Sequence, residues 1–294
     1  MLKSRKLIYV VLSLVSLVTV EMFSQKRNLD RLSQQQTEPS SMYALTPISQ
    51  RLIASIISKY QYMRPVHWGE TVPGVITKIN TRNKVVALTF DACGGSVASN
   101  GYDMDLIDFL IKENVPATLF INSRWIDANY NIFMKLAGNP LFEIENHGYL
   151  HKPLSVNGKS AYGIPGTLNV GEVIDEVLLN EQKIENLTGR KPRYFRSGTA
   201  YYDEVAVKIV YDLGLKPIGF NILGDAGANF NTKQVANACL SAVPGSIIIL
   251  HMNHPEKYTA EGIKLAIPEL KKKGFTFTKL ESYDNGYFST ASGR

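Results

Sequence analysis

From residue 84 onward, short apolar runs alternate with amphipathic segments, and this alternation constrains the fold more than any other feature. The apolar runs, which predict strands, are Val85–Phe90, Ala117–Asn122, Phe142–Asn146, Tyr194–Arg196, Pro217–Ile222, Ser246–His251 and Thr276–Leu280. The amphipathic segments, which predict helices, are Met104–Glu113, Tyr130–Ala137, Val170–Leu187, Glu204–Leu213, Thr232–Ala242 and Ala260–Lys273. Such β-α repeats predict an α/β fold with a parallel sheet of about seven strands, either closed as a barrel or open and doubly wound. The number and length of the strands favour a barrel.

The first predicted strand ends in an acidic residue. Val85–Phe90 is almost continuously apolar, as expected of a strand that helices cover on both faces, and Asp91 follows it directly. A carboxylate at the end of a buried strand needs a partner or a function. Because sites in α/β folds are built at this end of the strands, Asp91 is a candidate site residue. A cap on the following turn would also explain it.

Reactive side chains follow the later strands as well. His147 and His151 follow the third strand, and their spacing of four would place both imidazoles on one face of a helical turn, near enough to bind one metal ion. Arg196 ends the fourth strand, Asp225 follows the fifth, and His251 ends the sixth. Each has a structural interpretation when taken alone. Their recurrence at the same end of most strands favours an active site.

The motifs TFDxxG, HxxxH, FR after a short strand and LH after a buried strand, in that order, resemble the polysaccharide deacetylases of carbohydrate esterase family 4, the NodB-homology domain. The resemblance covers about residues 84–280. It implies a distorted (β/α) barrel that removes N- or O-acetyl groups from polysaccharides with a divalent metal, for which zinc is expected. The residues to which it assigns roles are Asp91 as catalytic base, His147 and His151 as metal ligands, Arg196 as the residue that orients Asp91, His251 as general acid and Asp225 as an acidic support.

One departure from the family pattern affects the metal site. The family motif TFDDG has a metal-binding aspartate after the base, whereas Ala92 stands there and has no donor atom. Asp91 itself could be a third ligand. Glu145 is a less favoured alternative, which strand alternation places on the same face as the first histidine. Cys93 and Cys239 show no zinc-binding spacing; a disulfide bond between them would need an oxidising compartment, and two isolated buried thiols are the commoner arrangement.

The N-terminus predicts export. Lys3, Arg5 and Lys6 precede an apolar run at residues 7–20, which is the layout of a secretory signal, although an uncleaved membrane anchor fits nearly as well. The predicted organisation is therefore a signal peptide or membrane anchor at 1–24, a polar tether and N-terminal extension at 25–83, the catalytic domain at 84–282 and a C-terminal tail at 283–294.

The positive charge is confined to the N-terminal part. Residues 1–83 contain 11 Lys and Arg against 4 Asp and Glu, whereas the remaining residues contain 21 against 22. The main domain thus gives no electrostatic support to nucleic-acid binding, and the basic arm fits an anionic membrane or wall polymer.

The sequence therefore predicts an exported deacetylase that acts on an acetylated cell-surface or cell-wall polysaccharide. Tyr201 and Tyr149 are candidates for stacking on sugar rings, with core packing as the alternative. Two other classes remain open. One is a tethered glycan-binding protein that has lost the metal at Ala92, and the other is a metal-free amidohydrolase that acts on small molecules.

Overall fold

The computed structural model describes residues 47–283 and 287–291. The predicted signal or anchor, residues 1–24, lies outside the described residues, as do residues 25–46 of the predicted tether and N-terminal extension. None of the helices in the described part of the chain is long and apolar enough to cross a membrane. The chain divides into residues 1–51 and a compact unit from Leu52 to Arg294, and the domain described below is this second unit.

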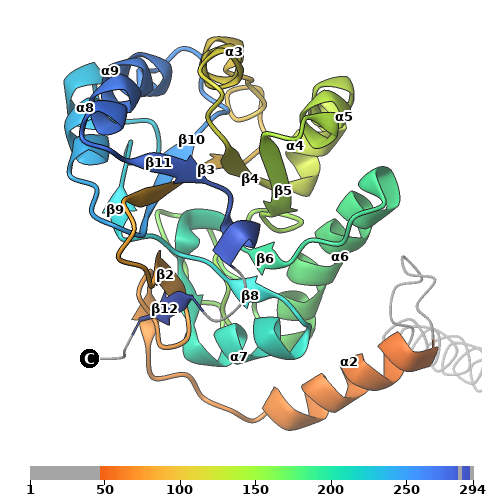
Figure 1. Ribbon diagram of the computed structural model, residues 1–294. Helices are drawn as coiled ribbons and strands as arrows, with labels where there is room; N and C mark the ends of the chain where they lie inside the picture. The colour runs from red at the N-terminus through yellow and green to blue at the C-terminus, as the bar shows by residue number, and fades with distance from the viewer. Residues whose placement is uncertain (1–46, 284–286, 292–294) are drawn as a thin grey trace, which may run out of the picture. The chain divides into compact units, whose positions relative to one another are not determined.

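Within the described residues, eight parallel strands form a sheet that curls into a distorted barrel (Figure 1). They are β3 (Val85–Ala92), β4 (Ala117–Ile121), β5 (Phe142–Asn146), β6 (Tyr194–Phe195), β8 (Lys216–Pro217), β9 (Ile222–Leu223), β10 (Ser246–His251) and β11 (Thr276–Thr278). The strands β10, β3, β4, β5, β6 and β8 are neighbours in that order, and β11 pairs with β3. Residues 216–223 join the two sides of the sheet, because β8 pairs with β6 and β9 pairs with β10. Every predicted strand overlaps at least one of these, and the predicted barrel is confirmed.

Helices pack against the outer face of the strands (Figure 1). They are α3 (Met104–Lys112), α4 (Ser123–Ala128), α5 (Tyr130–Gly138), α6 (Val170–Thr188), α7 (Glu204–Asp212), α8 (Thr232–Leu240) and α9 (Thr259–Lys272). Several begin where a side-chain oxygen accepts a backbone N–H of the first turn, as at Asp103, Asn169 and Asp203. All six predicted helices form. The short α4 was not predicted, because six residues are too few to show a helical period.

The structure differs from the prediction at both ends of the domain. The helix α2 (Pro47–Tyr60) buries Ile56 and Tyr60 in the same apolar cluster as residues of α6 and α7. The strand β2 (Ile76–Ile79) pairs antiparallel with β10 and with β12 (Phe288–Thr290). Residues 52–83 and 287–291 are therefore integral to the folded unit. The sequence predicts an N-terminal extension and a C-terminal tail here, since neither segment belongs to a β-α repeat.

Two further short strands lie beside the barrel. The strand β1 (Trp68–Gly69) pairs antiparallel with β7 (Tyr202–Asp203), which directly precedes α7. Two 3-10 turns complete the described elements, at Gly198–Ala200 after β6 and at Leu280–Tyr283 after β11. The β1–β7 pair attaches the N-terminal segment to the loop that follows β6.

Candidate active site

Asp91 and His251 are register partners at the carboxyl ends of two neighbouring parallel strands. Asp91 is the penultimate residue of β3, which is buried along its whole length, and His251 is the last residue of β10. Parallel strands end at the same edge of a sheet, so the loops that follow β5, β6 and β9 converge on this pair. The structure thus brings together the residues that the sequence placed at strand ends.

Arg196 holds Asp91 in a fixed orientation. The Arg196 side chain is fully buried, and its Nη1 atom donates to Oδ1 of Asp91 at 2.7 Å. Its Nη2 atom donates to the hydroxyl of Thr89 and the carbonyl of Gly219, each at 3.0 Å. A buried guanidinium remains charged, so it needs the carboxylate as its counter-ion. The second carboxylate oxygen of Asp91 lies 3.6 Å from Nε2 of His147.

His251 is bound to Asp225 by two hydrogen bonds. Its backbone N–H donates to Oδ2 of Asp225 at 2.7 Å, and its Nδ1 atom lies 2.9 Å from Oδ1. Asp225 is fully buried and also accepts the hydroxyl of Thr259 at 3.0 Å. Burial lowers the pKa of His251, but the Asp225 carboxylate outweighs it and raises the pKa well above its usual value. His251 therefore keeps its proton at neutral pH and can donate it.

Cys93, His147 and His151 form a potential metal site, with one ligand atom from each lying within 4.8 Å of the others. Nε2 of His147 is 3.9 Å from Sγ of Cys93, and Nδ1 of His147 is 2.8 Å from the carbonyl oxygen of Arg196. A carbonyl can only accept, so Nδ1 carries a hydrogen, and Nε2 is the nitrogen that faces Cys93 and would bind a metal. One thiolate and two imidazoles are a donor set that suits zinc. The residues present therefore fit the metal that the family resemblance implies.

The position of Cys93 corrects the interpretation of the two cysteines. Both are free; Cys239 is an isolated core thiol, but Cys93 is partly exposed and lies among the histidines. Burial raises the pKa of the Cys93 thiol, yet the three surrounding histidines outweigh it and lower the pKa well below its usual value. This favours the thiolate, the form that binds metals. One signal could have identified Cys93: it lies two residues after Asp91, the spacing of side chains on one face of a strand.

Neither Ala92 nor Glu145 takes part in the site. Ala92 is fully buried in the main apolar core, on which the outer helices pack. The Glu145 carboxylate accepts the backbone N–H groups of Arg193 at 2.9 Å and Tyr194 at 2.7 Å. These residues stand at the amino end of β6, and Glu145 is not part of the Cys93–His147–His151 group. The structure therefore does not bring Glu145 to the metal group.

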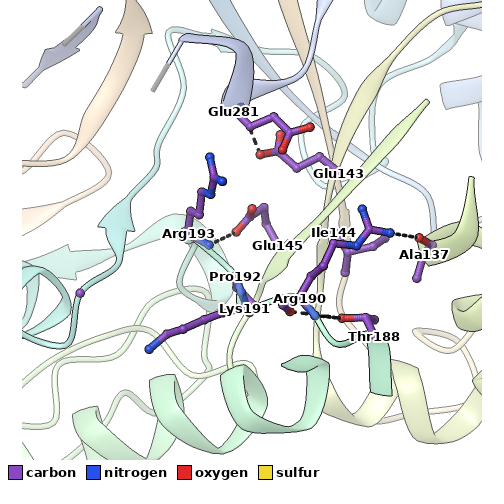
Figure 2. Close-up of a pocket in the computed structure, with 11 residues that line it drawn as sticks. Ala137, Glu143, Ile144, Glu145, Thr188, Arg190, Lys191, Pro192, Arg193 and Glu281 are labelled. Atoms are coloured by element: carbon purple, nitrogen blue, oxygen red, sulfur yellow. Dashed lines mark hydrogen bonds between the residues drawn. The ribbon is translucent and has the colours of Figure 1, made fainter. Parts of the chain in front are cut away.

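A pocket of about 440 Å³ lies at the amino ends of the strands (Figure 2). Its lining includes residues that precede β5, β6 and β8, such as Ala137, Thr188 and Gly214. Figure 2 shows the Glu143 and Glu145 side chains in it. Burial raises the pKa of both carboxyls, that of Glu143 to about 7. Because the strand-end residues described above lie at the carboxyl ends, this pocket is not the candidate active site.

Glu176, which the sequence analysis missed, positions the loop that carries His151. Its buried carboxylate accepts the backbone N–H groups of Leu150 and Lys152 on either side of that histidine, each at about 3 Å. Gly148 has a positive φ of 79°, and a Cβ there would overlap the Glu176 carboxylate. Position 148 therefore favours glycine, because of both its backbone conformation and the lack of space for a side chain. No sequence signal marks Glu176, since it lies within an ordinary amphipathic helix.

The two tyrosines predicted to bind substrate have different surroundings. The Tyr201 ring contacts the rings of Trp68 and Tyr162. Tyr149 is partly buried, and its backbone N–H donates to the carbonyl of Glu176 at 2.9 Å. A role in substrate binding stays a prediction for both.

Comparisons with known proteins agree with this fold. The family model for polysaccharide deacetylase matches residues 78–218. The peptidoglycan-N-acetylmuramic acid deacetylase PdaA of Bacillus subtilis is 25% identical over 207 residues, which are 69% of this chain and 72% of PdaA. The uncharacterized B. subtilis protein YlxY is 24% identical over 74% of this chain, and the match spans only 62% of the length of YlxY.

The solved structures that resemble the chain include an inactive relative. BA3943 of Bacillus anthracis, a CE4 family pseudoenzyme, is 24% identical with a TM-score of 0.60, over 72% of this chain and 69% of BA3943. A BA3943 mutant with restored enzymatic activity is 25% identical with the same TM-score, over 72% of this chain and 71% of that chain. Together with the family model and the barrel, these matches confirm the predicted resemblance: residues 78–218, a little under half of the chain, match the polysaccharide deacetylases, and the similar solved structures include members of carbohydrate esterase family 4.

Proposed function

We propose that the protein is a metal-dependent deacetylase that hydrolyses acetyl groups, N-acetyl groups foremost, on a cell-surface or cell-wall polysaccharide. The observation that carries the proposal is the meeting of three groups at one edge of the barrel. These are the Asp91–Arg196 ion pair, the His251–Asp225 pair and the Cys93–His147–His151 group. Glycan binding alone would not require a base, an acid and a metal group in contact.

Cys93, His147 and His151 would hold the metal, leaving a fourth position open, as in catalytic zinc sites. A bound divalent metal supplies a water of lowered pKa and polarises the acetyl carbonyl. A thiolate in place of the family's aspartate favours zinc over harder cations such as Mg²⁺.

Asp91 and His251 would carry the proton transfers. Asp91 accepts a proton from the attacking water, and the bond from Arg196 to its Oδ1 atom leaves Oδ2 on the side of His147. His251 enters the reaction protonated, because Asp225 stabilises its cation, and donates to the leaving amine or hydroxyl. General acid and general base catalysis each contribute roughly 10²- to 10⁴-fold to the rate.

The proposed location is outside the cytoplasm. The basic residues and the apolar run at the N-terminus support export, and membrane attachment follows if that segment is retained. The similarity to PdaA, whose name specifies peptidoglycan, supports a wall polymer as substrate class.

The proposal is tested by measuring acetate release from a panel of N- and O-acetylated glycans, with and without added Zn²⁺ or Co²⁺. Release that depends on the metal and disappears in His147→Ala supports it. If no member of the panel yields acetate at full metal occupancy, the proposed activity is wrong.

A second function, glycan binding without catalysis, is favoured by one observation. Ala92 replaces the metal-binding aspartate of the family, and a similar solved structure, BA3943, is a pseudoenzyme. Purified protein that retains glycan affinity but neither binds metal nor releases acetate would establish this function instead.

A further inference from the structure

We propose that Trp68, Tyr162 and Tyr201 form an aromatic subsite that binds a sugar ring next to the acetylated residue of the polysaccharide chain. This inference rests on the proposed function, in that a glycan is the substrate. Trp68 precedes the region that the family model matches, whereas Tyr162 and Tyr201 lie within it.

The three rings come from separate segments and meet around Tyr201. The Tyr201 ring centroid is 5.6 Å from that of Trp68, which belongs to β1, and 5.5 Å from that of Tyr162, which belongs to the loop before α6. Nearby buried rings such as Tyr202 are fully excluded from solvent. In contrast, Tyr162 is 74% exposed, and Trp68 and Tyr201 are partly exposed. The cluster therefore keeps aromatic surface in water, which marks a binding surface more often than a core.

The backbone that presents the rings is held in strained conformations. Thr199 and Ala200, just before Tyr201, have positive φ values of 68° and 58°, and Tyr162 itself has a φ of 52°. Each such residue costs on the order of 1 kcal/mol, and strain of this kind persists where surrounding contacts impose it. Here the contacts include the pairing of β1 with β7 and the bond from the Leu154 N–H to the Tyr201 carbonyl at 3.0 Å.

The cluster is connected directly to the candidate active site. Ser197, which follows Arg196, donates its hydroxyl to the Tyr201 carbonyl at 2.7 Å. Gly198 lies so close to the backbone of His151 that a Cβ would overlap its carbonyl oxygen. The segment 197–201 thus contacts the His151 backbone at Gly198 and carries the Tyr201 ring three residues later, so a glycan chain bound at the metal group could extend to the rings.

The polar groups around the rings suit a sugar. The Tyr162 hydroxyl contacts Glu70 at 3.2 Å, and the Lys159 amine lies 6.0 Å from the Trp68 ring centroid. Aromatic faces pack against the C–H faces of a sugar ring, while a carboxylate and an amine can bind its hydroxyl and acetamido groups. The occupant is thus a neutral or weakly charged sugar of the substrate polymer.

The test separates sugar binding from turnover. The probes are N-acetylated chitooligosaccharides of one to six sugars and acetylated xylooligosaccharides. Their affinities are measured by calorimetry in an Asp91→Asn background, and kcat/KM for each length is measured with Asp91 present. Trp68→Ala and Tyr162→Ala are compared with Tyr130→Ala, an exposed tyrosine on α5 that is 51% accessible.

We expect affinity to rise with chain length in the parent, and Trp68→Ala and Tyr162→Ala to lose about 10-fold on the longer chains only. Tyr130→Ala should retain the parent values, and Trp68→Phe should recover most of the loss. Equal losses on the monosaccharide, unchanged affinity in both alanine variants, or no binding of any probe would each overturn the subsite. Ring-dependent binding without acetate release would leave the subsite standing and remove the proposed catalysis.

Discussion

Nε2 of His147 lies 3.9 Å from Sγ of Cys93, so a thiol lies beside the histidines. The family pattern has its metal-binding aspartate one residue earlier, at the position of Ala92. The backbone carbonyl of Arg196 fixes the His147 tautomer, which leaves Nε2 available to a metal. This contact makes Ala92 compatible with a three-ligand metal site. Ala92 has no donor atom, but Cys93, the next residue, offers a thiol beside the two histidines.

Replacing Cys93 should weaken metal binding specifically. In Cys93→Ser we expect zinc affinity to fall by about 100-fold or more, since even changes to residues that only orient metal ligands cost 10- to 100-fold. With Co²⁺ bound, the parent should show a thiolate-to-cobalt charge-transfer band in the near ultraviolet, and Cys93→Ser should lack it. Cys239→Ser is the matched control, because Cys239 is a core thiol outside the site. A band that survives in Cys93→Ser would exclude Cys93 as a ligand.

His251 should be essential and His254 dispensable. His251→Ala should lower kcat by roughly 10²- to 10⁴-fold, as expected for loss of a general acid. His254 sits three residues later and contacts Glu256 at 3.3 Å, so His254→Ala should retain most of the activity. His254→Ala should unfold at the temperature of the parent, whereas His251→Ala leaves the buried Asp225 without its partner, so kcat is compared at a temperature at which both variants are folded. Comparable losses of kcat in the two would contradict the assignment of the acid.

Gly198→Ala should disturb the metal group through the backbone. The added methyl would overlap the His151 carbonyl, so this histidine must move, and zinc affinity should fall by about 10-fold or more. Gly138→Ala is the control, because nothing lies within 4 Å of a Cβ at that position. Zinc titration of both proteins measures the effect. Unchanged affinity in Gly198→Ala would show that the loop can adjust without displacing the ligand.

Glu176 should make stability fall as the pH rises. The pKa of Glu176 is raised from 4.5 to about 7. Burial is the largest cause, and hydrogen bonds from the backbone of Leu150 and Lys152 oppose it. The folded state therefore holds a proton between these values that the unfolded state has released. This contribution is fully present below pH 4.5 and is lost as the pH rises through 7.

The free energy of unfolding should consequently decline between about pH 4.5 and pH 7, by up to ~3 kcal/mol. Glu176→Gln should remove that part of the slope, as measured by urea unfolding at a series of pH values. Glu172→Gln, at a partly exposed residue paired with Lys152, should keep it. Parallel curves for the parent and Glu176→Gln would show that Glu176 titrates normally.

The elements that could be predicted from the sequence are those with a local signal. Each β-α repeat carries its own apolar run and amphipathic helix, so the strands β3 to β6 and β8 to β11 and the longer helices were found. Asp91 and His251 were found because each ends such a run. The strands β1, β2 and β12 were missed, since none of them belongs to a β-α repeat and each forms only against a partner distant in the sequence.

The composition of the metal group was missed for a different reason. The family motif directs attention to the position after Asp91, where Ala92 faces the apolar core. Cys93 was interpreted as an isolated thiol, because a single cysteine has no spacing to a second one. That it lies beside His147 depends on how β3 and β5 end in three dimensions, which no local pattern specifies.

The most direct test of the account is acetate release as a function of zinc bound per chain. Protein freed of metal is titrated with Zn²⁺, and acetate from the best glycan of the panel is measured at each occupancy, with His147→Ala alongside. The account predicts no release without zinc, a proportional rise up to one zinc per chain, and no rise in His147→Ala. Release that is independent of zinc occupancy, or absent at one zinc per chain, would contradict it.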